Sequence, residues 1–371
     1  LRQAVANANS IAGAQTITFG GSVFTDSTPD TITLTTGRLD LASDVSINGT
    51  GAKILSISGN NIDSIFGVTS GSVTVSGIRF TRGDSHSGAA INSIGSLALT
   101  VIGCDFDSNT AFVNGGAILH LEGSLLVIDS TFRNNVAQGG NGGAIYISDE
   151  SAVSVKIWNS TFSGNSAVSG GAVFSNYADV TSANCTITGN TATSGSGILA
   201  RGNSSAPLTT LSNTIVANNA GGADLAVDAF AGLIQSGGGN VIGNAGTNTT
   251  MGANDVVGTS GSPVGPMLDP LADNGGPTLT HAIRAGSPAL NRGLVANIPA
   301  DIADADGDNN TTEPVPYDQR GVGYGRSVGT APDAGAFELG KIISIAALDA
   351  SKAEGSSGTT AFTFTVSRIG D

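Results

Sequence analysis

Four aspartates within one short segment form the clearest metal-ligand pattern in this sequence. The run DIADADGDNN at 301–310 contains Asp301, Asp304, Asp306 and Asp308. Hard carboxylate oxygens at closely spaced positions are the ligands that Ca²⁺ takes in proteins. The run is not an EF-hand, because Gly307 falls at the fourth position counted from Asp304 and no Glu occupies the twelfth. The segment predicts either a calcium site or a solvated acidic loop, and calcium is the cofactor that the sequence suggests.

A second charged group consists of residues that stand beside phenylalanines at regular intervals. Its members are Arg79, Asp105, Asp107 and Arg133. The two aspartates flank Phe106, and the arginines stand one repeat before and one repeat after them. If consecutive repeats stack, these four side chains meet in one patch. Such a patch fits either a small saccharide site or a solvated charge cluster.

Catalysis on a polysaccharide would need a more specific arrangement than this patch. Hydrolysis requires two carboxylates that face each other across a groove, and elimination requires a Lys or Arg base with an acidic or calcium partner. The three histidines, His86, His120 and His281, are scattered along the chain and form no acid–base pair with these groups. The sequence leaves the enzyme question open and favours a non-enzymatic protein, with a polysaccharide lyase or hydrolase as the alternative.

A repeated unit must position these residues. Tetrapeptides of the type GGA[IV] or GSGI begin at 115, 142, 170 and 195, and they alternate with FxxN or IxxN tetrapeptides that begin at 106, 132, 162, 187 and 215. The Phe or Ile anchors, which include Phe80, recur every 25 to 30 residues. Imperfect periodicity of this length indicates a solenoid, in which each unit buries its apolar face against its neighbours.

Apolar residues within each unit alternate with period two, as in Leu97, Leu99 and Val101. This alternation indicates strands, and each coil has room for about three short ones. We therefore predict an all-β fold, a right-handed parallel β-helix built from such coils. The opening segment places Leu1, Val5 and Ala8 on one face, which predicts a short helix that caps the N-terminal end of the solenoid.

The repeated motifs themselves serve the corners of each coil. Asparagines three residues after the anchors predict a stacked ladder with five members, Asn109, Asn135, Asn165, Asn190 and Asn218. Asparagine tolerates left-handed backbone and bonds to its own main chain, which suits a tight corner. The paired glycines serve the other corner. The motifs therefore specify a fold and not a reaction.

Two cysteines belong to an inward-facing column two residues before the anchors. Cys104 and Cys185 share this column with Ile78, Ser130, Ser160 and Asn213. They lie three coils apart, which is roughly 14 Å at the spacing of parallel strands and beyond the ~7 Å between Cα atoms that a disulfide spans. We predict two buried free thiols.

An outward column of threonines runs along the same strands, through Thr131, Thr161, Thr186 and Thr214. Flat arrays of outward threonines can order water, so an ice-binding protein is a minor alternative. Threonine is also a good strand residue on a solvated face, and a second regular column is lacking.

Composition limits the class of partner. The formal net charge of −14 argues against nucleic acid and against an anionic membrane surface. The 54 glycines and the 12% of charged residues describe a turn-dense chain, and 371 residues are enough for a sizeable core. No apolar run approaches the length of a membrane span.

The GGA[IV] and FxxN units, over about residues 66–220, resemble the repeats of the polymorphic outer membrane proteins, a family of surface β-helix adhesins. The opening LRQAVANAN, followed by GAQTITF, is similar to the start of many secreted bacterial right-handed β-helix proteins. These resemblances imply an extracellular or cell-surface location and an adhesive role.

The C-terminal third resembles two other modules. NGGPTLTHAIRAGSPALNRG, DQRG at 318–321 and PDAGAFE at 332–338 place residues 268–338 close to the choice-of-anchor Q module of exported surface proteins. Residues 343–371 resemble the first third of a Calx-beta domain, a calcium-binding sandwich, in which Glu354 matches a calcium position. The expected organisation is a β-helix with its cap at 1–222, degenerate final coils of choice-of-anchor Q type at 223–340, and the truncated start of a Calx-beta-like domain at 341–371.

We expect, on these grounds, a secreted structural or adhesive protein. Its long faces would offer a rigid platform to a glycan, to a surface protein, or to copies of itself in filaments or arrays. We expect neither a nucleic-acid partner nor a membrane span within this segment.

Overall fold

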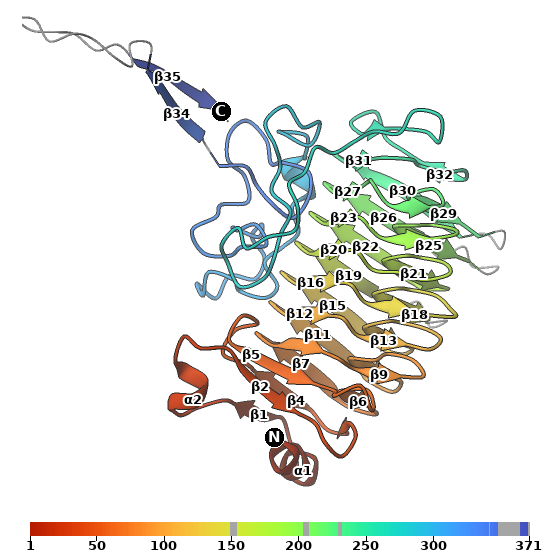
Figure 1. The fold of residues 1–371 in the computed structure, drawn as a ribbon, viewed down its shortest axis with the longest axis vertical. Helices are drawn as coiled ribbons and strands as arrows, with labels where there is room; N and C mark the ends of the chain where they lie inside the picture. Colours follow the sequence, from red (N-terminus) through yellow and green to blue (C-terminus); the bar gives the residue numbers. More distant parts are fainter. Residues whose placement is uncertain (149–153, 203–207, 229–231, 341, 348–363, 370–371) are drawn as a thin grey trace, which may run out of the picture.

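The chain forms a long solenoid with a segment of loops attached to one side (Figure 1). The computed structural model describes residues 1–148, 154–202, 208–228, 232–340, 342–347 and 364–369. Three long sheets of parallel strands, which we name sheets A, B and C, run along the solenoid. The prediction of an all-β parallel solenoid is confirmed.

Sheet A and sheet B each contain ten strands in strict chain order. Sheet A is made of β1 (Gln15–Thr18), β4 (Val45–Asn48), β7 (Ser72–Ser76), β11 (Ala98–Ile102), β15 (Ser124–Ile128), β19 (Ser154–Trp158), β22 (Asp179–Ala183), β26 (Leu208–Ser212), β30 (Leu233–Gly238) and β32 (Thr249–Thr250). Sheet B is made of β2 (Asp30–Thr33), β5 (Leu55–Ser58), β8 (Arg79–Thr81), β12 (Asp105–Asp107), β16 (Thr131–Arg133), β20 (Thr161–Ser163), β23 (Thr186–Thr188), β27 (Ile215–Val216), β31 (Val241–Ile242) and β33 (Val256–Val257). The coils therefore continue past residue 222, as far as β33.

Sheet C completes the coil with eight strands. They are β3 (Leu39–Leu41), β6 (Phe66–Val68), β10 (Ile91–Ser93), β14 (Ile118–His120), β18 (Ile145–Ser148), β21 (Val173–Asn176), β25 (Ile198–Arg201) and β29 (Leu225–Val227). Short strands at the corner between sheets B and C pair in two small groups, namely β9 (Asp84–Ser85), β13 (Thr110–Ala111) and β17 (Val136–Ala137), then β24 (Thr191–Ala192) and β28 (Ala220–Gly221). The predicted three-strand coil is thus the repeating unit.

Short helices and one hairpin lie outside the regular coils. Helix α1 (Arg2–Ser10) buries Val5 and Ala8 against the first coils, which confirms the predicted N-terminal cap. Helix α2 (Ser22–Thr25) and the 3-10 turn η1 (Val295–Asn297) are single turns in loops. Strands β34 (Ile342–Ala347) and β35 (Phe364–Ile369) pair antiparallel, and Glu354 lies outside the described residues.

The anchor phenylalanines form a continuous stack through the core. Phe106, Phe132 and Phe162 lie with ring centroids 4.5 and 4.7 Å apart and with rings almost parallel. Phe80 extends the stack at 4.9 Å, and Phe66 of β6 meets the Phe80 ring edge-on at 5.4 Å. Every ring is fully buried. Offset or stacked aromatic pairs contribute beyond their buried area, so this column fixes the register of successive coils.

The asparagine ladder connects each coil to its neighbours. The amide oxygen of Asn135 accepts bonds from the backbone and side-chain nitrogens of Asn109 at 3.1 and 2.9 Å, and its amide nitrogen donates to the Phe106 carbonyl. The same bonds recur through Asn165 and Asn190. The left-handed residue is the one before each ladder position, as in Ser108 and Asn134, so the reason for asparagine is bonding between coils.

The fifth member of the ladder is Asn219, and the prediction of Asn218 was wrong. The Asn219 amide oxygen accepts from the backbone and side chain of Asn190. Asn218 is exposed and left-handed. The cause is a shift in register, because Val216 pairs with Ile187 and Ile215 pairs with Thr186. The true anchor of this coil is one residue later than the motif suggests.

The same shift corrects the inward column that contains the cysteines. Thr214, and not Asn213, accepts the backbone bond from Cys185 at 3.3 Å. Ser130 accepts the equivalent bond from Cys104 at 3.1 Å. Both thiols are free and buried, as predicted. Burial raises the pKa of Cys104 to about 12 and that of Cys185 to about 11, so both thiols stay protonated.

The paired glycines of the GGA[IV] motif occupy the corner before sheet C. The first glycine of each pair, such as Gly115 or Gly142, has a positive φ of 63° or 68°. A Cβ on the second glycine, Gly116 or Gly143, would lie 2.1 Å from a backbone oxygen of the next coil. Only glycine fits such an approach, which explains the motif.

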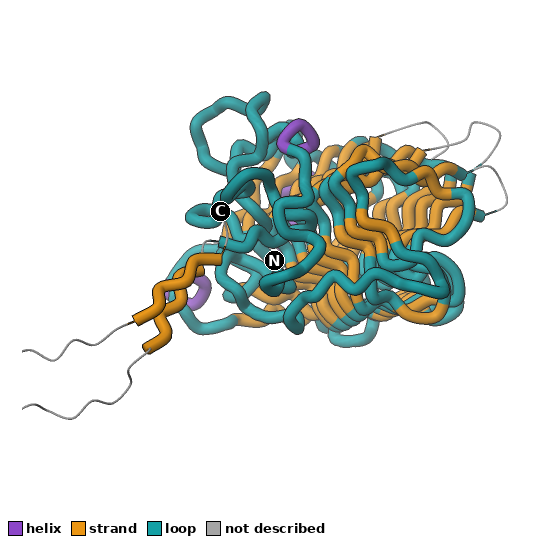
Figure 2. Tube along the Cα trace, turned by 90° about the horizontal axis from the view of Figure 1, so that it is seen from above, coloured by secondary structure: helices purple, strands orange, loops and turns teal. Residues whose placement is uncertain are grey.

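Residues 268–339, which we call the strap, leave the coil stack and fold back along the outer face of sheet B. The strap lies beside the stacked strands in both views (Figures 1 and 2). Its apolar residues pack on the outer side of sheet B, where Ile215 and Val241 contact a cluster that includes Ile283, Ala289 and Phe337. A second contact places Ala303 against the cluster of Ile128, Trp158 and Ala183 on sheet A. The strap therefore covers part of the solenoid as a lateral segment.

Candidate functional site on the outer face of sheet B

The candidate site is the outer face of sheet B, on which two columns of side chains alternate with the buried anchors. Strand register places one column through Thr31, Ser56, Arg79, Asp105, Thr131, Thr161, Thr186, Ile215 and Val241. The other column runs through Thr33, Ser58, Thr81, Asp107, Arg133, Ser163 and Thr188. The face changes along its length from hydroxyl groups to charges, then to hydroxyls again, and finally to apolar groups.

The four charged residues predicted as a patch are brought together. Arg133 contacts the carboxylates of Asp105 and Asp107 at 3.1 and 2.9 Å. Arg79 pairs with Asp107, and its Nε lies 3.7 Å from Asp105. Each carboxylate is therefore shared between arginines from two neighbouring coils. We call these four side chains the charge cluster.

The carboxylates of the charge cluster are buried, and the expectation of a solvated cluster was wrong for them. Asp105 and Asp107 are 6% and 5% exposed. Burial raises the pKa of Asp105, while the Arg133 and Arg79 guanidinium groups oppose that rise. Arg79 remains the exposed member, with 37% of its side chain accessible. The cluster is thus a buried ionic link between coils with one accessible guanidinium.

The threonine column lies beneath the strap. The side chain of Gln319 accepts a bond from the Thr161 hydroxyl at 2.5 Å and donates to the Thr131 hydroxyl at 2.9 Å. The Thr186 hydroxyl accepts from the backbone nitrogen of Ala336 at 3.0 Å. These threonines are at most 1% exposed, and Thr214 points inward. The predicted solvated threonine array is therefore absent from this part of the sheet, and with it the basis for ordering water.

The DQRG and PDAGAFE motifs form the interior of the strap. DQRG and PDAGAFE meet where Arg320 pairs with Asp318 at 2.6 Å and the Glu338 backbone donates to Asp318 at 2.7 Å. Arg326, which is 1% exposed, pairs with the Glu338 carboxylate at 2.8 Å. Burial raises the pKa of Glu338 to about 7, and the positive charge of Arg326 opposes the rise. Gly335 lies so close to sheet B that a Cβ would be 2.8 Å from Thr186 and Ile215.

His281 serves the strap as a structural residue. Its Nε2 lies 2.9 Å from the Ser163 hydroxyl, and its Nδ1 lies 2.7 Å from the Asp269 carbonyl. Burial lowers the pKa of this imidazole, so the ring is neutral near pH 7. It links the strap to the second outward column of sheet B.

The acidic run forms a compact loop at the edge of the strap. Oxygen atoms of Asp304, Asp306 and Asp308 lie within 4.8 Å of one another, and those of Asp301, Asp306 and Glu313 form a second such group. Asp301 is almost fully buried, and burial together with the neighbouring aspartates raises its pKa. A cation would offset this repulsion, and an all-carboxylate donor set suits Ca²⁺.

Glu313 and Arg82 are the residues of interest that sequence patterns did not identify. Glu313 joins the acidic loop because its carbonyl accepts a 2.7 Å bond from the Asp301 backbone, which closes the loop on itself. No periodicity marks that closure. Arg82 occupies the left-handed corner position that Ser108, Asn134 and two glycines take in later coils. A long charged side chain at this position of the repeat is the signal by which the sequence could have identified it.

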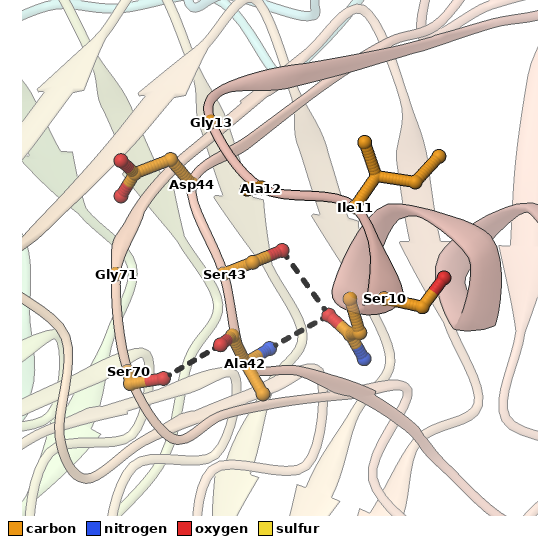
Figure 3. A pocket seen from close by; sticks show the side chains of 10 residues that line it. Ser10, Ile11, Ala12, Gly13, Ala42, Ser43, Asp44, Ser70 and Gly71 are labelled. Atoms are coloured by element: carbon orange, nitrogen blue, oxygen red, sulfur yellow. Dashed lines mark hydrogen bonds between the residues drawn. The ribbon is translucent and has the colours of Figure 1, made fainter.

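A separate hollow lies where the N-terminal cap meets the first coils (Figure 3). It has a volume of 480 Å³ and is lined by the end of α1 and by turns at 42–44 and 70–71. The Asn9 amide oxygen accepts bonds from Ala42 and Ser43 at 3.0 and 3.4 Å. These bonds hold α1 against the first coils. The hollow therefore belongs to the contact between the N-terminal cap and the solenoid.

Comparisons with known proteins bear on the fold. The family model described as "Right handed beta helix region" matches residues 89–264. No curated protein and no solved structure gives a significant match to the chain. Among the described residues, no helix has the length and apolar character to cross a membrane. The matched family model and the three stacked parallel sheets together show that the fold is a right-handed parallel β-helix.

Proposed function

We propose that this chain is a non-enzymatic structural or adhesive module of an extracellular or cell-surface protein. Its role is to hold a rigid polar face toward a glycan or a partner protein. The resemblance of residues 66–220 to surface adhesin repeats, and of 268–338 to the choice-of-anchor Q module, supports this location.

The main support for the proposal is that both carboxylates of the charge cluster are paired with arginines. Arg79 and Arg133 both approach Asp105 and Asp107 within 4 Å, and the carboxylates are buried. A general acid or nucleophile must reach the scissile bond of its substrate. Carboxylates that link neighbouring coils serve to stiffen the sheet beside the exposed threonine hydroxyl groups of β2. This arrangement supports a binding platform over a hydrolytic site.

The test is to incubate the purified 371-residue protein with acidic and neutral polysaccharides while binding and chain cleavage are measured together. We expect retention on a glycan surface without new reducing ends and without the ultraviolet absorbance of an elimination product. Depolymerisation that is lost in Asp105→Asn or Asp107→Asn would overturn the proposal in favour of a lyase or hydrolase. Electron microscopy of the same sample tests self-association, for which filaments or arrays are the expected form.

A further inference from the structure

One pocket on sheet B concentrates hydroxyl and guanidinium groups. It has a volume of 260 Å³ and is lined by Thr31, Thr33, Ser56, Ser58, Asn60, Arg79, Thr81 and Arg82. Every lining side chain carries a polar hydrogen-bond donor. The two charged members are both arginines, on a chain whose formal net charge is −14. The charged side chains that line the pocket are therefore all positive, and Arg82 carries the charge that lies outside the charge cluster.

The hydroxyl groups are arranged by the register of sheet B. Thr31 pairs with Ser56, which pairs with Arg79, so the first outward column crosses the pocket on three adjacent strands. The second column crosses it through Thr33, Ser58 and Thr81. Neighbouring strands are about 4.8 Å apart, so donors recur at that interval in two rows. This pattern suits an extended ligand with polar groups along its length.

Arg79 is held in place before any ligand arrives. Its terminal nitrogen pairs with Asp107, which is itself fixed by Arg133 at 2.9 Å. The Nε of Arg79 forms no hydrogen bond, although it is shielded from solvent. A guanidinium that is fixed on one side and has 37% of its side chain accessible loses little entropy when it binds a carboxylate.

Arg82 adds a second positive charge at the corner of the pocket. Its backbone is left-handed, with a φ of 53°, and its side chain is exposed. The equivalent position of the next coils is Ser108, then Asn134, then Gly164 and Gly189. Left-handed backbone is unfavourable for a long side chain. The pocket thus contains a charge where the fold alone would favour a small residue.

We propose that this pocket binds the carboxylate of an acidic sugar, a uronate unit within a glycan, through Arg79 and Arg82. Charge-assisted bonds from guanidinium groups to the carboxylate supply the selectivity for acid over neutral sugar. The serine and threonine rows of β2, β5 and β8 bond to the sugar hydroxyls. This inference rests on the proposed function, because it names the ligand class and the position of the glycan on that platform.

The test uses isothermal titration calorimetry of the whole 371-residue protein with a tetramer of galacturonic acid. Three proteins are compared, namely the unchanged chain, Arg82→Gln, and Arg284→Gln as a matched loss of an exposed arginine on the strap. We expect Arg82→Gln to weaken binding about tenfold, the loss typical of one charge-assisted bond, and Arg284→Gln to leave it unchanged. The methyl ester of the same tetramer, which lacks the charge, should bind no better than Arg82→Gln binds the acid.

Each outcome separates this inference from the proposed function. Equal binding of the acid and its ester, or an unchanged affinity in Arg82→Gln, overturns the uronate pocket and leaves a glycan platform elsewhere intact. Cleavage of the tetramer overturns the proposed function instead. Absence of binding to the tetramer, with retention of a neutral glycan, also rejects the uronate pocket. Thermal melting of Arg82→Gln, which we expect to match that of the unchanged chain, excludes unfolding as the cause of a loss.

Discussion

The outer face of sheet B has two halves that are built alike and covered differently. On β2, β5 and β8, the uncovered half, threonine, serine and arginine side chains border a pocket, and the charge cluster of β12 marks the boundary. On β16, β20, β23, β27 and β31, the covered half, the first outward column consists of threonines and aliphatic residues beneath the strap. The strands and the core anchors continue across the boundary. The two halves of sheet B therefore differ in their outward residues. These residues determine whether a stretch of the sheet packs against the strap or stays accessible to a partner.

Breaking the attachment of the strap should give the largest effect. Gln319 is fully buried and bonds to Thr131, Thr161 and Thr278. Gln319→Ala leaves these hydroxyl groups without that partner, and we expect a loss of roughly 3 kcal/mol in unfolding free energy. Denaturant melts measure this loss, and hydrogen exchange should show faster exchange on β16 and β20 than on β5. Gln3→Ala, on the exposed face of α1, is the control; equal exchange in both halves would contradict the comparison.

Breaking the charge cluster at the boundary should give a smaller effect. Asp107→Asn removes one buried carboxylate and leaves Arg79 and Arg133 to share Asp105. Loss of one partner of a buried ion pair is strongly destabilising, but the exposure of Arg79 reduces the cost, and we expect about 2 kcal/mol. The exposed pair of Arg284 with Asp269 is the matched control, and Asp269→Asn should change the melt by less than about 0.5 kcal/mol. Similar losses in the two variants would show that burial of the cluster is unimportant.

A lower pH should raise the unfolding free energy by about 1 kcal/mol through a residue of the strap, on the covered half. The pKa of Glu338 in the folded strap is raised to about 7 from an ordinary value of 4.5, so the folded chain binds more protons than the unfolded chain between these values. Stability is therefore gained as pH falls from 8 to 6, by about 1 kcal/mol. Denaturant melts across this range should show the gain, and Glu338→Gln should flatten the profile. A rise in stability with increasing pH over the same range would refute the assignment to Glu338.

Calcium should give the smallest effect, because it acts on one loop of the strap. A site formed by Asp301, Asp306 and Glu313 would add about 1 kcal/mol when calcium is present at several times its Kd. The melting temperature with calcium, with magnesium and with chelator measures the gain. Asp306→Asn, which belongs to both carboxylate groups, should abolish it, and Asp269→Asn should not. An identical melt in all three solutions would leave the run as an acidic loop.

The solenoid was predictable because its determinants repeat. Phe106, Phe132 and Phe162 each have the same neighbours in sequence and in space, so one unit explains the next. The prediction failed where a coil lengthened by one residue, since IVAN still matched the motif although Val216, and not Ile215, occupies the anchor position. The IxxN motif does not distinguish the register with Ile215 as the anchor from the register with Val216 as the anchor. The pairing of β23 with β27 does distinguish them.

The candidate site was only partly predictable. Arg79, Asp105, Asp107 and Arg133 follow from the register of the repeat, and they meet as expected. The strap does not follow from it, because Gln319 bonds to Thr161 across 158 residues of sequence with no shared period. Burial of the threonine column depends on such non-local contacts, which explains why it was expected to be solvated. The Asp105 carboxylate, in contrast, contacts the arginines of the neighbouring coils.

The route by which the strap leaves the solenoid has a mechanical consequence. The last residues of the strap are fixed at its interior and at the side of the solenoid, since Leu339 bonds to Asp333 and Ala336 bonds to Thr186 on β23. Tension applied beyond residue 339 would therefore enter the solenoid through its flank and not through its last coil. Hydrogen bonds and packing contacts along the covered half would then bear that tension at the same time. A pull on the final coil, in contrast, would separate the coils from the stack one after another.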